Sequence, residues 1–329
     1  MKKFINNIDD FLEESLQGFA KAHSDIVQLN EAPHFVKRNT PTPANKVALI
    51  SGGGSGHEPL HTGFVGKGML DAACPGQIFT SPTPDQMMAA AEAVENSGGV
   101  LFIVKNYAGD VMNFEIASEM IDCDFETVLI DDDVSLPKNH STGRRGVAGT
   151  LIVEKMVGAA AEKGLDLATC KALGDKINQM TASMGVALNC GTVPALGKQT
   201  FELDADKIEM GVGIHGERGH DTIDLCNATE IVAQLADAIN EDLSPQKGQK
   251  ALLHINGLGA TPLMELHLIY NLAAKYWEDK GVEICRSLVG NYTTSLDMAG
   301  CSITLTLLDE EMIELWDAPV NTANLRWGC

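Results

Sequence analysis

The chain has few basic residues for its length. It carries 24 Lys and Arg against 45 Asp and Glu among 329 residues, which gives a formal net charge of −21. Nucleic acids and anionic membranes are bound through cationic surfaces, so the composition argues against both as partners. A surface with such an excess of one sign is typical of a soluble protein whose copies repel one another.

Paired cysteines and long apolar runs are missing as well. The eight cysteines are scattered without any CxxC spacing, and several lie within apolar stretches. We interpret them as reduced, mostly buried thiols of a cytoplasmic protein. No apolar run is long enough to span a bilayer, and no signal peptide is recognised before the first expected helix. The expected location is therefore the cytoplasm.

One glycine-rich segment stands out, the SGGGSGHEP of Ser51–Pro59. It follows Lys46–Ile50, an apolar run whose length is typical of a buried parallel strand. Glycines let the backbone turn sharply and bring its N–H groups close to a ligand. The segment matches neither of the common glycine-rich phosphate-binding patterns, and a plain tight turn is the alternative. His57 favours a functional role, because the carboxyl ends of strands are where open α/β sheets bind ligands.

The order of the expected elements indicates an α/β fold. Apolar residues at helical spacing predict an amphipathic helix over 4–22. Beyond it, short apolar runs alternate with helical stretches, which predicts a mostly parallel sheet with helices on both faces. We expect two α/β domains, each with a mostly parallel or mixed sheet flanked by helices. The N-terminal domain would span 1–183 and the C-terminal domain 184–329.

Residues 72–84 are expected to form a second cluster of loops. The helix after them is predicted to start near Pro84, with Thr83 or Ser81 as its N-cap. Further strands are expected at 98–104, 127–130, 184–189, 250–255, 282–289 and 302–308.

Three titratable side chains, His57, Asp110 and His215, follow apolar runs and have glycine neighbours. A neutral histidine exchanges a proton near pH 7, and a carboxylate acts as a base or orients a hydroxyl. A histidine is also a nucleophile towards a carbonyl carbon. Each residue taken alone is more often structural, but their common setting favours an active site.

Two other charged clusters have competing interpretations. Asp131–Asp133 offers oxygen ligands for Mg²⁺, but consecutive residues on an extended chain point in alternating directions. A solvated loop or a cap is favoured there, and no metal site is assigned. Arg144 and Arg145 would either clamp a phosphate at a helix start or pair with Asp131–Asp133. We treat four further histidines as ordinary residues: His140, His220, His254 and His267.

Nine motifs together resemble one family. They are SGGGSGHEP at 51–59, CPGQIFTSPTP at 74–84, KNYAGD at 105–110, IDDD at 130–133, GRRGV at 143–147, GVGIHGE at 211–217, NGLGATP at 256–262, TSLDM at 294–298 and WDAP at 316–319. Over essentially the whole chain, the sequence resembles the substrate-binding subunit of dihydroxyacetone kinase.

The resemblance implies a role for each candidate residue. His215 matches the histidine that binds dihydroxyacetone covalently as a hemiaminal, which excludes polyols without a carbonyl. His57 and Asp110 match the acid/base pair that polarises the substrate and deprotonates its terminal hydroxyl. The residues that match those holding the substrate hydroxyls are Gly54, Ser55, Gly56 and Lys105.

The resemblance also implies partners. No P-loop or kinase-type lysine and glycine loop occurs in the chain. No cofactor is therefore expected on it, and ADP or ATP with Mg²⁺ would be carried by a nucleotide-binding kinase subunit. The phosphoryl group would come from phosphoenolpyruvate through a phosphotransferase-system protein, and the chain would form a homodimer. The alternatives are a non-catalytic dihydroxyacetone-binding coactivator of a transcription regulator and, less favoured, a lipid-binding protein of similar architecture.

Overall fold

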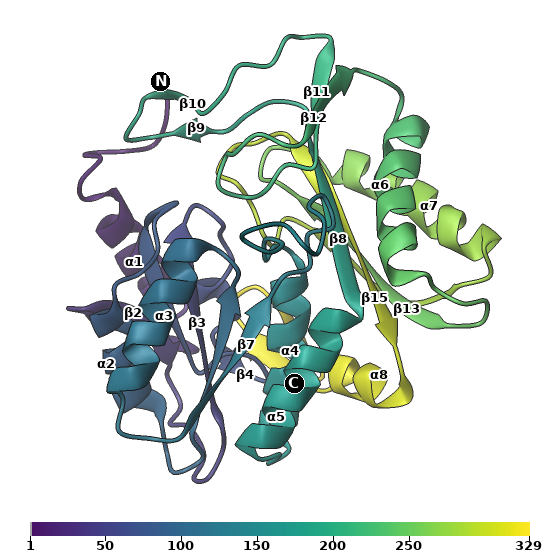
Figure 1. Ribbon diagram of the computed structural model, residues 1–329. Coiled ribbons are helices and arrows are strands. Elements are labelled where there is room, and N and C mark those ends of the chain that lie inside the picture. The colour runs from purple at the N-terminus through teal and green to yellow at the C-terminus, as the bar shows by residue number, and fades with distance from the viewer. Residues whose placement is uncertain (1) are drawn as a thin grey trace. The chain divides into compact units, whose positions relative to one another are not determined.

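The computed structural model describes residues 2–329, and the chain forms two compact units (Figure 1). The first unit comprises the chain up to Ile130 together with Leu151–Lys176 and Ile313–Cys329. The second comprises Asp131–Thr150 and Ile177–Met312. This division differs from the single domain change expected near residue 184. The reason is that later segments return to the first unit, where Gly174 packs against Val128 and Asn321 pairs with Lys67.

The first unit contains a six-stranded sheet in the order β1-β2-β5-β3-β6-β7. Its strands β5, β3, β6 and β7 are parallel, while β1 and β2 form an antiparallel hairpin at one edge. Every residue of β6 is buried, as expected for a parallel strand covered on both faces. The strands are β1 (Val27–Glu31), β2 (His34–Arg38), β3 (Ala48–Ser55), β5 (Ala72–Ile78), β6 (Val100–Lys105) and β7 (Phe125–Ile130).

Helices lie on both faces of this sheet. On one face α2 (Pro84–Val94) and α3 (Ala108–Met120) lie side by side (Figure 1) and enclose a core that includes Ile50, Phe102 and Phe114. Side chains of α4 (Gly149–Glu162) and α5 (Leu167–Gln179) reach the other face. The start of α2 is confirmed, since Thr83 is its N-cap and forms a capping box with Gln86. Smaller elements are the 3-10 turn η1 (Thr62–Phe64) and a three-stranded sheet of β4 (Gly66–Lys67), β16 (Val320–Thr322) and β17 (Arg326–Trp327).

Two local predictions for this unit are wrong. The first helix, α1, spans Phe11–Ala22 and does not begin at residue 4. The preceding Asn and Asp side chains bond locally, as between Asn7 Nδ2 and Asp10 Oδ2 at 3.0 Å, and such bonds compete with helix formation. Residues 72–78 form strand β5 instead of a loop, because β5 lies between two strands that supply its hydrogen-bond partners.

The second unit has a six-stranded mixed sheet in the order β12-β11-β8-β15-β13-β14. Only β13 and β14 are parallel to each other, and the other neighbours are antiparallel. Helices α6 (Ala228–Leu243) and α7 (Leu263–Asp279) supply Leu235, Leu266 and Trp277 to its core. The strands are β8 (Thr181–Ala187), β11 (Lys207–Met210), β12 (Asp221–Asp224), β13 (Lys250–Gly257), β14 (Glu283–Gly290) and β15 (Gly300–Leu308); the shorter elements are β9 (Thr192–Val193), β10 (Lys198–Gln199) and α8 (Glu310–Asp317).

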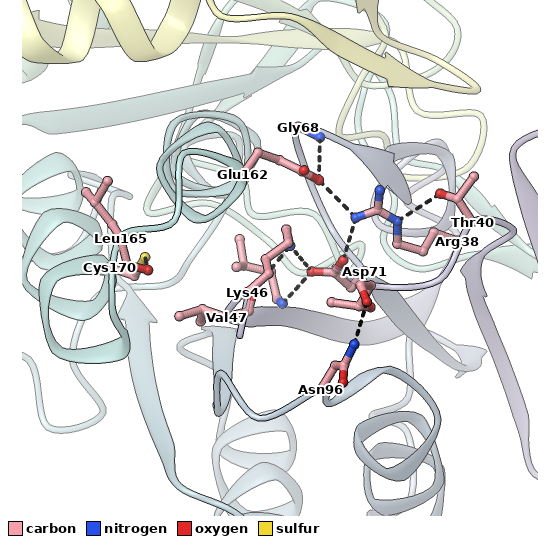
Figure 2. A network of polar contacts seen from close by, with 12 residues as sticks. Arg38, Thr40, Lys46, Val47, Gly68, Asp71, Asn96, Glu162, Leu165 and Cys170 are labelled. Carbon is pink, nitrogen blue, oxygen red and sulfur yellow. Dashed lines mark hydrogen bonds and ion pairs between the residues drawn. The ribbon is translucent and has the colours of Figure 1, made fainter. Parts of the chain in front are cut away.

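A buried ionic network fixes the first sheet to α4 (Figure 2). The carboxylate of Asp71 accepts hydrogen bonds from Arg38 Nη1 at 2.9 Å, Lys46 Nζ at 2.5 Å and the Leu49 amide at 2.9 Å. Arg38 Nη1 also donates to Glu162 Oε1 at 2.9 Å. Two cations therefore face two carboxylates, and each buried charge has a partner of opposite sign. Among residues 2–329, no helix is long and apolar enough to cross a membrane.

Candidate active site

The glycine-rich segment continues strand β3 before it turns. The strand extends through Ser55, five residues beyond the apolar run, and the chain turns at Gly56, whose φ is +107°. Glycine is needed within the strand because of close neighbours. A Cβ on Gly53 would lie 2.4 Å from Lys105 Nζ and 3.4 Å from Asp110 Oδ2. The backbone of Gly53 thus lies directly over these two side chains.

Lys105 and Asp110 form a buried pair at adjacent element ends. Lys105 is the last residue of β6 and Asp110 lies in the first turn of α3, with 3.8 Å between Nζ and Oδ2. Burial raises the pKa of Asp110 and Lys105 opposes this effect; burial lowers the pKa of Lys105, which Asp110 and Glu154 oppose. A carboxyl group with a raised pKa and an adjacent amine are suited to moving a proton near neutral pH.

The residues around the turn at Gly56 are placed differently from one another. His57 is fully buried, and its ring stacks on Phe79 with 5.2 Å between ring centroids. The Ser55 hydroxyl donates to Gly76 O at 2.7 Å, so its side chain holds the sheet together. The Gly56 amide donates to the Glu58 carboxylate at 3.0 Å. Of the three residues of this segment that are expected to bind substrate, Ser55 and Gly56 therefore also make hydrogen bonds within the protein. Gly54 offers only its backbone groups.

His61 was missed by the sequence reasoning. Its ring is buried, with Nε2 2.7 Å from Lys105 Nζ and Nδ1 2.6 Å from Glu154 Oε1. Ser51 Oγ lies 3.0 Å from the same Nδ1. Burial, then Lys105 and His57, lowers the pKa of His61 well below its ordinary value, whereas burial raises the pKa of Glu154 to about 8. The side chains that define this setting are far apart in sequence, so no local motif could have indicated it.

A cavity of about 410 Å³ lies beside this cluster, between α1 and the glycine-rich strand. Its volume is within the range of small-molecule sites. The lining residues from the glycine-rich region include Gly53, Gly54, Ser55, Glu58 and His61.

His215 belongs to the second unit, in the segment that follows β11. Its amide donates to Glu217 Oε2 at 2.7 Å, and the other oxygen of Glu217 lies 3.2 Å from Arg145 Nη1. A Cβ on Gly213 would lie 1.7 Å from Glu217 Oε1, so only glycine leaves room for that carboxylate. The buried side chains of Val212 and Ile214 hold the segment on either side of Gly213. The segment that carries His215 is thus held by the Glu217 carboxylate and by the buried side chains of Val212 and Ile214.

Arg145 connects this segment to Asp133 through hydrogen bonds and ion pairs. Its guanidinium donates to Asp133 Oδ2 and to Gly211 O, each at 2.7 Å, in addition to Glu217. Of the two interpretations of the arginine pair, the structure shows the pairing with an acidic residue of Asp131–Asp133. Arg144 instead donates to Asp242 Oδ1 at 2.8 Å.

The aspartates of the IDDD motif have structural contacts. Asp132 accepts from the amides of Val147 and Gly149, both at 2.8 Å, and thereby caps the start of α4. Asp131 bonds to Asn178.

The chain matches known proteins over nearly its full length. The Dak1 domain family matches residues 17–324. The dihydroxyacetone-binding subunit DhaK of the PEP-dependent dihydroxyacetone kinase of Escherichia coli K12 is 45% identical over 356 residues, with 100% of both chains covered.

Solved structures also resemble the chain over most of its length. The dihydroxyacetone kinase operon co-activator DhaQ has a TM-score of 0.89 and 32% identity, covering 94% of this chain and 97% of that chain. The native dihydroxyacetone kinase of C. freundii has a TM-score of 0.88 and 34% identity. There the match covers 99% of this chain and 60% of that chain.

Proposed function

Because the chain belongs to the Dak1 domain family, we propose that it is the dihydroxyacetone-binding subunit of a dihydroxyacetone kinase. The observation that carries this proposal is the buried Lys105–Asp110 pair under the backbone of Gly53. The bare backbone of Gly53 approaches this proton-transferring pair closely, and Gly53 also lines the cavity of about 410 Å³, which is the proposed place for a short polyhydroxy substrate. The full-length match to the E. coli subunit supports the same assignment.

His215 is the proposed nucleophile. A ring nitrogen attacks the ketone carbon, a C–N bond forms, and the carbonyl electron pair moves to oxygen. The oxygen takes up a proton and the other ring nitrogen releases its own, which gives a neutral hemiaminal. The neighbouring Gly216 has a φ of +72°, which favours glycine, and the position of its missing Cβ is occupied by Thr200. Glycerol has no carbonyl and cannot form the adduct, which makes the bond itself a basis for specificity.

Asp110 and His57 are the proposed acid/base groups. The terminal hydroxyl of the substrate transfers its proton to Asp110, and its oxygen then attacks the phosphorus of the donor in line. Lys105 and the backbone at Gly54, Ser55 and Gly56 hold the hydroxyls. Positioning supplies much of the rate, since phosphoryl transfer needs little covalent help from the protein.

The donor belongs to a partner in this proposal. A nucleotide-binding kinase subunit carries ADP or ATP with Mg²⁺, and a phosphotransferase-system protein supplies phosphoryl groups from phosphoenolpyruvate. The names of the E. coli relative and of the C. freundii structure support kinase chemistry. A homodimer of this chain is proposed with it, and analytical ultracentrifugation tests that state directly.

The covalent step is tested by intact-protein mass spectrometry with dihydroxyacetone. We expect an adduct in the wild type and none in His215→Ala. His220→Ala is the matched control, because His220 is an exposed histidine of the same segment. An undiminished adduct in His215→Ala would exclude this residue as the nucleophile.

Asp110→Asn separates the adduct from turnover. The variant keeps the shape of the side chain but cannot act as a base, so we expect the adduct to form while turnover falls by about 10²- to 10⁴-fold. Turnover is measured as dihydroxyacetone phosphate formed with the nucleotide-binding partner and a phosphoryl donor. Wild-type turnover in Asp110→Asn would remove this residue from the mechanism.

A coactivator is the second candidate, favoured by the similarity to the DhaQ structure. A coactivator that binds dihydroxyacetone would form the same adduct but no phosphorylated product. Adduct formation without product, whichever kinase partner is supplied, would support this second function.

A further inference from the structure

The amine of Lys105 is fixed by its surroundings. A lysine ammonium has three N–H donors, and this one is fully buried. His61 Nε2 lies 2.7 Å from Nζ, Gly52 O lies 3.2 Å away, and Asp110 Oδ2 lies 3.8 Å away. Two donor directions are thus occupied at hydrogen-bond distance. The third is left for Asp110 and for a ligand bound beside it.

The contact between His61 and Lys105 restricts where the protons lie, because two N–H groups cannot point at each other. In one arrangement the Glu154 carboxylate accepts from Nδ1–H, and Nε2 accepts from the Lys105 ammonium. In the other, protonated Glu154 donates to Nδ1, and Nε2–H donates to a neutral Lys105 amine. The total number of protons is the same. Passing from the first to the second breaks the Nζ–H and Nδ1–H bonds and forms the Nε2–H and Oε1–H bonds.

The groups around His61 favour different arrangements. Ser51 Oγ donates to Ile103 O at 2.7 Å, so its oxygen is an acceptor towards Nδ1–H, which fits the first arrangement. Burial raises the pKa of Glu154 and lowers the pKa values of Lys105 and His61. All three shifts favour a neutral imidazole and fewer buried charges. In either arrangement, one proton is shared between His61 and Lys105.

We propose that His61, held by Glu154, is a positioning residue that fixes the Lys105 amine against Asp110 and shares a proton with it. Without this acceptor, Nζ loses its shortest contact and is free to rotate away from the substrate hydroxyl. The inference rests on the proposed function for its effect on turnover. The proton arrangement itself is a property of the ligand-free protein.

Three substitutions test the role of the ring. His61→Phe keeps a planar ring without nitrogen atoms, and His61→Gln keeps a terminal acceptor within reach of Nζ. We expect His61→Phe to lower kcat about 10²-fold, as for misplaced catalytic groups, with the His215 adduct retained. His61→Gln should recover kcat to within about tenfold of the wild type. His254→Gln, at another fully buried histidine, is the matched control and should leave kcat unchanged.

Nuclear magnetic resonance of the ¹⁵N-histidine-labelled, ligand-free protein reads the proton arrangement directly. We expect one protonated and one unprotonated ring nitrogen for His61 at neutral pH, and a changed signal in Glu154→Gln. A doubly protonated ring would overturn the proposal, as would wild-type kcat in His61→Phe or equal losses in His61→Phe and His61→Gln. If the wild type forms neither adduct nor product, the proposed function fails, while the spectrum still decides whether His61 accepts from Lys105.

Discussion

Replacing Gly53 by alanine places a methyl group directly on the amine of Lys105. The added Cβ would lie 2.4 Å from Nζ, whereas ordinary contacts begin at 3.4 Å. Nζ must therefore move by about 1 Å to reach van der Waals distance. Gly53 is not among the glycines with positive φ, so alanine suits the backbone and the clash is the only obstacle.

This displacement should affect catalysis more than stability. A shift of about 1 Å in a catalytic group costs about 10²-fold in rate, or about 2.7 kcal/mol of transition-state stabilisation. Lys105 has a flexible side chain that can yield, so the free energy of unfolding should fall by at most about 1.5 kcal/mol, the net worth of one hydrogen bond. We expect kcat/KM for dihydroxyacetone to fall while the protein remains folded.

Gly54→Ala is the comparison variant for protein stability. Its Cβ would lie 2.5 Å from Thr80 N and 2.8 Å from Phe79 Cα, and these backbone atoms cannot yield. Overpacking of this kind lowers stability by about 1–3 kcal/mol. The assays are turnover with the kinase partner and urea denaturation for each variant. If Gly53→Ala keeps kcat/KM within about twofold of the wild type, the proposed position of Lys105 at the substrate is refuted.

Three further predictions concern the supporting structure. Asp71→Ala leaves Arg38 and Lys46 without their shared carboxylate, and we expect urea denaturation to show a loss of about 3–5 kcal/mol; a loss below about 1 kcal/mol would contradict the network in Figure 2. Arg145→Met removes the contacts to Glu217 and Gly211 and should slow the formation of the dihydroxyacetone adduct about 10- to 100-fold, measured by time-resolved mass spectrometry, whereas Arg144→Met should not. Burial lowers the pKa of His254 from 6.5 to about 4, so the unfolded chain binds the additional proton between these values. Stability should therefore fall as pH falls from 6.5 to 4, by up to about 3 kcal/mol, and His254→Gln should lack this part of the pH dependence in denaturation curves.

The sequence predicted those elements whose signals are local. Thr83 and Pro84 mark the start of α2 through a cap and a proline at the first turn, and the structure has the helix there. The apolar run before Lys105 is strand β6, buried on both faces. In both cases the residues that determine the element are neighbours in the sequence.

Strand β5, whose formation depends on contacts with residues distant in sequence, was mispredicted. Residues 72–78 contain Pro75 and Gly76, which are poor strand formers, yet they form β5 because two neighbouring strands supply hydrogen bonds. The expected single domain boundary differs from the observed units for a similar reason. The residues near 184 do not indicate that two distant segments, 151–176 and 313–329, pack with the first unit.

The histidines show most clearly where sequence reasoning ends. His57 and His215 were selected because glycines lie beside them, and glycine is a signal that sequence contains. His61 and His254 lack such neighbours, and both are fully or nearly buried, yet their settings differ. The ring of His61 contacts Lys105 and Glu154. By contrast, His254 Nδ1 is hydrogen-bonded to the carbonyl oxygen of Leu288 at 3.0 Å.

A buried histidine becomes part of a proton-transfer system only when a second titratable group is brought within hydrogen-bond distance. For His61 the fold provides two such groups, Lys105 from β6 and Glu154 from α4. Removing either contact should leave a buried imidazole comparable to His254, with a structural role alone. The supporting residues of the proposed active site are therefore identified by the charged side chains that the fold brings to the His61 ring, which the glycine-rich motifs do not indicate.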